Sequence, residues 1–390
     1  MPMITDDHLA LLRLLACGGA SAPRRRLLGH TRTPVAALEA GPATWRACGL
    51  EPAQLATLRS SASPPGRILD WLAAPGHHLL GWHEADYPSL LRQVDSPPLA
   101  LFVAGDPDAL WQPAVAVVGS RRPSPGGLDN ARGFARALAR SGLTVTSGMA
   151  AGIDTVAHQA CLAQGGSTIA VLGTGPDVAY PPGNLDLHAD LLARGVVVSE
   201  FPPGTGPRPE HFPRRNRIIA GLTLGTLVIE AAARSGALIT ARLAAEAGRE
   251  VFAVPGSVHN PMARGCHRLI GEGATLVQDI DDLTDALAPL AFRLADDLRR
   301  RLGAPTSGDH VIGEGPPAVS GGGAPGNSLK ESCDGPDHNT LWESLGHDPT
   351  DMDQLVERSG LTAAQVSSML LVMELEGRVT SQHGRYFRRH

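Results

Sequence analysis

Short apolar runs in this 390-residue chain end abruptly in glycine, serine or a charged residue. The clearest example is Gly119-Ser120-Arg121, which directly follows the run AVAVV. Glycines let a ligand approach the backbone, hydroxyls and free amide groups bind oxyanions, and arginine adds positive charge. These residue types therefore predict a phosphate-binding site. The other run ends of this kind are Ser147, Gly148, Gly173, Gly175, Ser199, Glu200, Pro255 and Gly256.

A second candidate for anion binding is the basic stretch HFPRRNRIIA, residues 211–220. Pro213 suits the first turn of a helix, which would place the polar side chains after it at the amino end of that helix. That end carries free N–H groups and a partial positive charge, and both favour oxyanions. Arg215 taken alone is interpreted as part of a solvated basic turn. The candidate phosphate ligands of this stretch are Arg214, Asn216 and Arg217.

Acidic residues suited to catalysis are few near these run ends. Glu200 and Glu230 each end a predicted strand, and acid–base catalysis needs such a pair of carboxylates within reach of one substrate. Glu230 is more readily interpreted as an ion-pair partner of Arg234 or of a pocket arginine. Asp154 is expected to cap the helix that carries His158, and His158 is expected to be a structural histidine.

Aromatic side chains make up 4% of the chain, and those near the run ends are Tyr180, Phe201 and Phe212. Proteins that bind single strands without sequence preference combine a basic groove with aromatic stacking platforms. With so few platforms, binding would depend mainly on backbone phosphates and would be sensitive to salt. Neither glycine-rich run end completes a GxGxxG fingerprint, so no nucleotide cofactor is predicted.

The elements that must position these residues follow from the same apolar runs. The runs are short, rich in β-branched residues and separated by segments with helical spacing, as is typical of parallel strands buried on both faces. In such an open sheet, ligands bind outside the carboxyl ends of the strands. The predicted fold class is therefore α/β: an extended Rossmann-like parallel sheet domain, with a small helical N-terminal domain and a C-terminal winged-helix domain. The runs are AVAVVGSR, LTVTSG, TIAVLGTG, VVVSEF, TLVIEAA and VFAVPGS.

Composition divides the chain into four parts. Residues 1–70 are predicted to form a small helical domain, and residues 71–302 the sheet domain. Residues 303–336 are rich in Gly, Pro and Ser and lack periodicity, which predicts a flexible linker. Residues 337–390 contain three helical stretches followed by a hairpin-like alternation, the order of a winged helix.

The third helix of this last part opens with a capping-box pattern, Thr362 with Gln365. It carries no Arg or Lys between Arg358 and Arg378, whereas helices that read the major groove usually present basic or amide side chains. Docking to a protein is therefore favoured over base reading. Weak DNA contact is left open for the wing arginines, which are Arg385, Arg388 and Arg389.

Bulk properties narrow the class of protein. The net charge of −5 argues mildly against a general polyanion binder, and the five cysteines form no cluster at metal-ligand spacing. We therefore expect a reduced, cytoplasmic protein without a structural metal. No apolar run approaches the roughly 20 residues that span a bilayer, so no membrane association is expected.

These motifs, in this order and spacing, resemble the DNA-processing protein family known as DprA or Smf. The resemblance is strong over residues 80–285, and the tail is similar to the C-terminal extension common in that family. For residues 1–70 the resemblance implies a SAM/helix-hairpin-helix-like domain. The matching segments are Gly119-Ser-Arg121, Ser147-Gly-Met-Ala-Ala-Gly-Ile-Asp154, Tyr180-Pro-Pro-Gly-Asn184, Ser199-Glu-Phe201, Phe212-Pro-Arg-Arg-Asn-Arg217, Arg234-Ser-Gly236 with Thr240, and Val254-Pro-Gly256.

The resemblance implies a non-enzymatic, dimeric protein that binds single-stranded DNA and delivers it to RecA recombinase during natural transformation. Many relatives carry a lysine in the Tyr-Pro-x-x-Asn turn, where this chain has Pro182 and Gly183. The implied phosphate contacts are Gly119, Ser120, Arg121, Ser147, Gly148, Arg214, Asn216 and Arg217. Further pocket or base contacts would be Gly173, Tyr180, Asn184, Phe212, Glu230, Ser235, Gly236 and Thr240.

The main alternative is a nucleotide-processing enzyme of the lysine-decarboxylase-like phosphoribohydrolase type. That class uses a Gly-Thr-x-x-Glu pattern preceded by PGG. This chain has Gly225-Thr226, but Glu230 comes one residue late and no PGG precedes it. A third option is a scaffold whose winged helix recruits a partner.

Overall fold

The structure is a computed structural model that describes residues 4–60, 63–302, 336–346, 348–375, 378–382 and 385–388. It divides into two compact units, Met1–Leu294 and Ala295–His390, and each is described by itself. The predicted linker, residues 303–336, lies outside the described residues except for its last residue. No helix in the described ranges is both long and apolar enough to cross a membrane.

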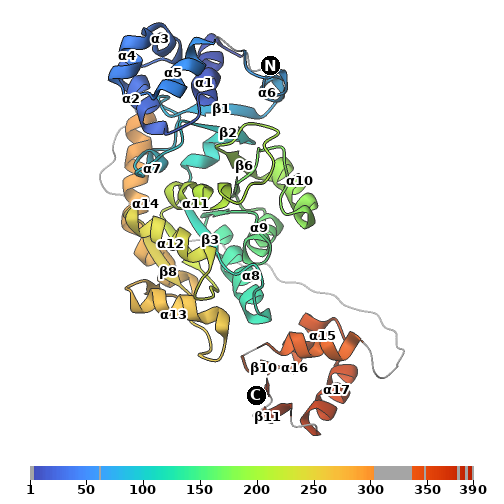
Figure 1. Cartoon of the computed structure of the whole chain (residues 1–390). Coiled ribbons are helices and arrows are strands. Elements are labelled where there is room, and N and C mark those ends of the chain that lie inside the picture. Colours follow the sequence, from blue (N-terminus) through green and yellow to red (C-terminus); the bar gives the residue numbers. More distant parts are fainter. Residues whose placement is uncertain are drawn as a thin grey trace. The chain divides into compact units, whose positions relative to one another are not determined.

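Helices occupy the first 70 or so residues of the larger unit: α1 (Asp6–Ala16), α2 (Ser21–Thr31), α3 (Pro34–Glu39), α4 (Gly41–Ala47), α5 (Pro52–Arg59) and α6 (Gly66–Ala73). Four of their leucines, Leu11, Leu14, Leu27 and Leu28, are fully buried. The same apolar cluster includes Phe102 of the sheet. The helices therefore pack against the end of the sheet formed by β1 and β2, as Figure 1 shows.

One mixed sheet organises this unit, with the strand order β1-β2-β6-β5-β4-β3-β7-β8-β9. The strands from β6 to β9 are parallel, and β1 and β2 extend the sheet in antiparallel register. This confirms the predicted fold class. The strands are β1 (His77–Gly81), β2 (Ala100–Ala104), β3 (Ala114–Val118), β4 (Thr144–Ser147), β5 (Thr168–Leu172), β6 (Val196–Ser199), β7 (Gly225–Val228), β8 (Glu250–Ala253) and β9 (Thr275–Leu276).

Helices cover both faces of the sheet because successive strand residues point to opposite sides. In β3, Ala116 and Val118 pack with residues of α11, α12 and α13, whereas Val115 and Val117 pack with residues of α8, α9 and α14. The helices of this unit are α7 (Ser89–Arg92), α8 (Pro125–Arg140), α9 (Ile153–Ala163), α10 (Leu185–Arg194), α11 (His211–Leu222), α12 (Gly236–Glu246), α13 (Arg264–Gly271) and α14 (Ile280–Leu302). The turns of 3₁₀ helix are η1 (Pro107–Trp111), η2 (Pro182–Asn184) and η3 (Pro261–Ala263).

The order of the strands reverses between β3 and β7. From β3 the chain builds β4, β5 and β6 on one side, and it then returns to add β7, β8 and β9 on the other. Loops that follow two strands on either side of such a reversal diverge and leave a crevice between them, which is where open α/β sheets bind ligands. Gly119-Ser120-Arg121 directly follows β3 and therefore lies at this crevice.

The smaller unit contains α15 (Pro336–Leu345), α16 (Met352–Ser359) and α17 (Ala363–Leu375), with the strands β10 (Thr350–Asp351), β11 (Val379–Gln382) and β12 (Arg385–Arg388). The antiparallel pair β11–β12 forms the predicted hairpin, and β10 joins it as a third strand. The predicted capping box is confirmed, since the Gln365 amide donates to Thr362 Oγ1 and the Thr362 amide donates to Gln365 Oε1. This arrangement is that of a winged helix.

Candidate nucleic-acid interface

A pocket of about 630 Å³ opens at the reversal between β3 and β7. Its walls come from the loop after β3, the start of α9, the first turns of α11 and the start of α12. The predicted site residues that line it are Gly119, Ser120, Arg121, Tyr180, Phe212, Asn216, Ser235, Gly236 and Thr240. Residues 119–121, 212–216 and 235–240 are far apart in the sequence, and the fold brings them to one cavity.

The pocket carries a net positive charge. Three arginines line it, Arg121, Arg215 and Arg234, and Asp154 is the one carboxylate among its lining residues. Arg121 and Arg234 are exposed. Sequence reasoning did not include Arg234 among the contacts, although it directly precedes the predicted Ser235-Gly236 loop. The electrostatics of the cavity favour a polyanion over a neutral ligand.

Arg215 was interpreted from the sequence as a solvated residue, and this is wrong. It is 4% exposed, and its guanidinium donates to the carbonyl of Val171 at the end of β5. Burial is the main cause that lowers the pKa of Arg215 to about 10; Asp154 opposes this shift, and the like charge of Arg121 adds to it. The signal was available, because Arg215 lies three and four residues before Ile218 and Ile219 and so shares the buried face of the helix.

Asp154 does not cap its own helix as expected. The N-cap of α9 is Gly152, and Asp154 instead accepts hydrogen bonds from the amides of Gly148 (3.1 Å) and Ala150 (3.4 Å). Burial raises the pKa of Asp154, and the positive charge of Arg215 opposes that rise. The carboxylate therefore fixes the loop between β4 and α9.

Ser147 and Gly148, which were predicted to contact phosphate, belong to this wall and do not line the cavity. The Ser147 hydroxyl is buried and donates to the Val117 carbonyl at 2.6 Å, and the Gly148 amide is bonded to Asp154. A Cβ atom at position 148 would overlap the Arg215 guanidinium. Both residues shape the wall of the space that Arg215 occupies. Neither of them is proposed to contact a phosphate directly.

Arg214 and Arg217 also lie outside the pocket, contrary to the predicted convergence with Arg121. In a helix, residues 214 and 217 share one face, and residues 212, 215, 216 and 219 share the neighbouring one. Arg217 forms an ion pair with Glu200 and its side chain is 17% exposed. The Arg214 guanidinium lies 5.8 Å from the centre of the Phe201 ring.

Two aromatic rings stand at the pocket. Tyr180 is 38% exposed, and its ring centre lies 5.3 Å from that of Phe212 at an interplanar angle of 40°. Gly173 packs closely against this pair, because a Cβ atom at that position would approach the Phe212 ring to 3.0 Å. Asn184 is structural, since it donates to the Met149 carbonyl at 3.0 Å and to Thr155 Oγ1 at 2.9 Å.

The acidic residues considered for catalysis are separated. Glu200 follows β6 and Glu230 follows β7, and three strands lie between these two. Glu230 does not pair with Arg234. Its carboxylate accepts hydrogen bonds from the Ser124 amide (2.8 Å), the Ser124 hydroxyl (2.6 Å) and Asn260 (2.8 Å). It thereby anchors Ser124, the N-cap of α8.

His158 is a structural histidine, as expected. Its Nδ1 is hydrogen bonded to Thr168 Oγ1 at 2.8 Å, and burial lowers its pKa to about 3. Among the described residues, no group of three or more His, Cys, Asp or Glu side chains is arranged to hold a metal ion.

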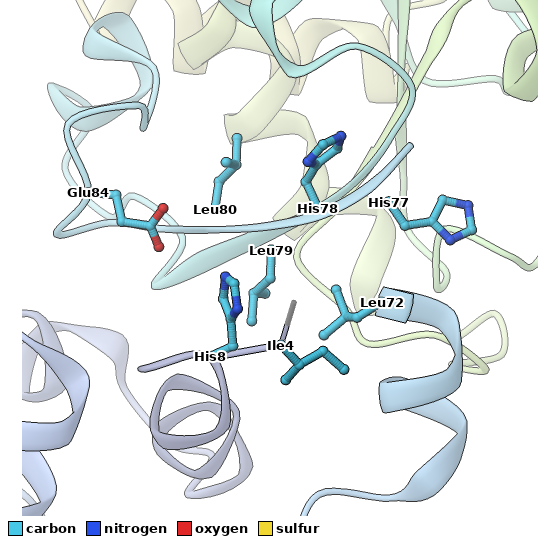
Figure 2. A pocket seen from close by; sticks show the side chains of 8 residues that line it. All are labelled: Ile4, His8, Leu72, His77, His78, Leu79, Leu80 and Glu84. Atoms are coloured by element: carbon cyan, nitrogen blue, oxygen red, sulfur yellow. The ribbon is translucent and has the colours of Figure 1, made fainter. Parts of the chain in front are cut away.

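A second cavity, about 210 Å³ in volume, lies between α1, α6 and β1. Figure 2 shows its lining residues: Ile4, His8, Leu72, His77, His78, Leu79, Leu80 and Glu84. Glu84 and His77 stand near opposite ends of β1, and His8 and His78 lie on opposite sides of the strand. Burial lowers the pKa of His8 and of His78, which favours neutral rings. The polar side chains of this cavity do not point toward one common centre, and no arginine is among the described residues that line it. It therefore lacks the positive charge and the converging polar groups of the larger pocket.

The larger pocket and its surroundings define a class of protein: a Rossmann-like sheet with a cation-lined crevice at the strand reversal, joined to a winged helix. Residues 78–288 match the family described as DNA recombination-mediator protein A, and residues 328–385 match the DprA winged helix domain. The chain belongs to the DNA recombination-mediator protein A family, also called DprA or Smf. This confirms the resemblance inferred from the motifs and supports a role in DNA processing.

Similar proteins come from several bacteria. The chain is 40% identical over 321 residues to Protein Smf of Escherichia coli (strain K12), which covers 82% of this chain and 79% of that protein. It is 48% identical over 197 residues to the DNA processing protein DprA of Streptococcus pneumoniae, over 50% of this chain and 70% of that protein. The X-ray structure of the S. pneumoniae DprA superposes with a TM-score of 0.65 at 37% identity, covering 72% of this chain and 98% of that one.

Proposed function

We propose that this protein binds single-stranded DNA in the pocket between β3 and β7. The observation that carries the proposal is the pocket's composition: three arginines, one buried aspartate and two aromatic rings line it. Arginine guanidinium groups and backbone amides hold phosphates without reading sequence, and exposed rings stack with unpaired bases. The strand reversal gives this surface the concave shape that a flexible single strand can enter.

Each part of the pocket has a role in this proposal. Arg121 and Arg234 contact phosphates from opposite walls, and Arg215 supplies positive charge from the floor. Asn216 joins them from α11, where its side-chain amide also reaches the Gly236 carbonyl at 3.5 Å. Tyr180 and Phe212 stack with a base. The remaining contacts proposed for the backbone and hydroxyl groups are Gly119, Ser120, Ser235, Gly236 and Thr240.

We further propose that the bound strand is handed to RecA recombinase during natural transformation and that the protein acts as a homodimer. The membership in a recombination-mediator family supports the first part. The second is supported by apolar side chains near the free edge of the sheet, since Leu276 on β9 is 42% exposed and Phe292 on α14 is 71% exposed. A cytoplasmic location is supported by free thiols at Cys17, Cys48, Cys161 and Cys266.

The proposal is tested by replacing Arg121 with alanine and measuring DNA binding by fluorescence anisotropy. Loss of one charge-assisted contact is expected to weaken binding of single strands about 10- to 100-fold, for all sequences alike. The slope of log K against log salt should fall by roughly 0.7. Arg132→Ala on α8 is the matched control, because the side chain of that arginine is 40% exposed and pairs with Asp129 of the same helix at 2.8 Å. Equal affinity of Arg121→Ala and wild type for single strands would contradict the proposal.

We propose that the protein is not an enzyme. Support comes from the separation of Glu200 and Glu230 and from the structural use of the Glu230 carboxylate. The phosphoribohydrolase alternative is tested by incubating the protein with nucleoside monophosphates and assaying for free base. Release of base that depends on Glu230 would overturn this part of the proposal and leave the DNA-binding part standing.

A further inference from the structure

A second group of arginines is shared between the N-terminal helices and α11. It consists of Arg24 and Arg25 on α2 and Arg214 and Arg217 on α11, and we refer to it as the junction cluster. The two helices are about 190 residues apart in the sequence, and the fold brings their charges within electrostatic reach. Burial lowers the pKa of Arg24 and of Arg25, and the like charges of Arg214 and Arg217, respectively, add to this lowering.

Backbone contacts fix the position of the cluster. The Arg25 guanidinium donates to the Pro97 carbonyl at 2.7 Å, and the next carbonyl, that of Pro98, accepts a hydrogen bond from the Tyr87 hydroxyl at 3.0 Å. Tyr87 is fully buried and belongs to the same apolar cluster as Ile218 and Leu222 of α11. Arg25 is thus connected to α11 through the Pro97–Pro98 segment and the buried Tyr87 side chain.

The cluster has more positive than negative charge. Among the ion pairs of the described residues, the pair of Arg217 with Glu200 is the one that involves a member of the cluster. Arg24 is 5% exposed and donates to the carbonyls of Leu14 and Gly19, at 2.9 Å each, so it adds positive charge to the cluster from a buried position. Four guanidinium groups near one carboxylate repel one another, and an added anion would relieve that repulsion.

An aromatic stack connects the cluster to the pocket. Phe201 and His211 are parallel within 15°, with ring centres 3.8 Å apart, and Arg214 lies over the outer face of Phe201. His211 precedes Phe212, whose side chain lines the pocket. The pocket and the junction cluster therefore occupy adjacent faces of the first two turns of α11.

We propose that the junction cluster is a second phosphate site for the same DNA strand, so that a strand leaving the pocket crosses α11 and continues onto α2 of the helical domain. The inference rests on the proposed function and extends it, because it gives the N-terminal helices a part in DNA binding. It also accounts for why Arg214 and Arg217 do not line the pocket with Arg121: they contact the phosphates of the next stretch of the strand.

The experiment measures the affinity of the full chain for oligothymidylates of increasing length. For the Arg25→Ala/Arg214→Ala double variant, we expect wild-type affinity for the shortest oligonucleotides that bind. For long ones we expect a loss of about 10-fold and a salt slope smaller by roughly 1.4, the value for two phosphate contacts. Arg46→Ala on α4, an exposed arginine of the same helical domain, should bind every length like wild type.

The outcomes separate this inference from the proposed function. If Arg121→Ala weakens binding at every length but the double variant gains affinity with length as wild type does, the junction cluster is not a phosphate site. If Arg121→Ala binds single strands with the affinity of wild type, the proposed function itself is refuted. Since Arg25 donates to the backbone, Arg214→Glu serves as a second variant that removes no hydrogen bond of the described structure. Its length-dependent loss should exceed that of Arg214→Ala, and a loss equal at all lengths would also refute the inference.

Discussion

Replacing Glu230 with alanine removes the acceptor of three hydrogen bonds at the base of the pocket loop. The carboxylate is 5% exposed and binds the Ser124 amide, the Ser124 hydroxyl and the Asn260 side chain at 2.6 to 2.8 Å. Ser124 is the N-cap of α8 and follows the Arg121 loop by three residues. The substitution should therefore loosen both the start of α8 and the loop that presents Arg121.

The expected loss of stability follows from the number and kind of hydrogen bonds that the Glu230 carboxylate accepts. A hydrogen bond to a charged group contributes about 1.5 to 3 kcal/mol, and three that share one carboxylate are not fully additive. We expect Glu230→Ala to lower the free energy of unfolding by about 4 kcal/mol. For a unit of this size, that corresponds to a melting temperature lower by roughly 8 °C. Glu230→Gln keeps one acceptor oxygen and should cost about half as much.

Thermal and urea unfolding followed by circular dichroism measure the effect, and Glu246→Ala on α12 is the control. Glu246 is 53% exposed and pairs with Arg242 at 3.5 Å, so its removal should change stability by less than about 0.5 kcal/mol. If Glu230→Ala unfolds like Glu246→Ala, the structural role assigned to Glu230 is wrong. A stable Glu230→Gln variant that loses a base-releasing activity would instead favour the enzyme alternative.

Two further predictions concern the buried walls of the pocket. Gly148→Ala should weaken DNA binding and lower the melting temperature, because its Cβ would overlap the Arg215 guanidinium. Gly133→Ala on α8, where open space surrounds the glycine, is the control. Equal DNA binding and equal melting temperatures of the two variants would contradict the packing described. His158 has a pKa of about 3 when folded and 6.5 in the unfolded chain, so the unfolded state binds more protons between these values and stability falls as the pH decreases through that window. From pH 6.5 to 5 this amounts to about 2 kcal/mol, and His158→Gln should remove that part of the acid destabilisation in melts at the two pH values. An unchanged pH dependence in His158→Gln would show that this ring is not responsible.

The parallel strands could be predicted from the sequence because burial on both faces requires continuous apolar runs, which β3 to β8 display. Three strands of the sheet, β1, β2 and β9, were missed, and two of them lack such runs. β1 begins with two half-buried histidines, and β9 is only two exposed residues long. Neither carries the composition of a buried strand, and both are recognised only by their pairing with β2 and β8.

The sequence by itself determined the fold class, the family and the loop that carries Arg121, since these follow from local composition, residue spacing and the position of each loop after a strand. It did not determine which basic residues meet. Arg215 is buried and lines the pocket together with Arg121 and Arg234, whereas Arg214 and Arg217 lie outside it. These placements depend on the phase with which α11 packs on the sheet and on contacts between residues 20 to 200 positions apart. The local sequence around each residue does not specify such long-range contacts, so only the tertiary structure decided them.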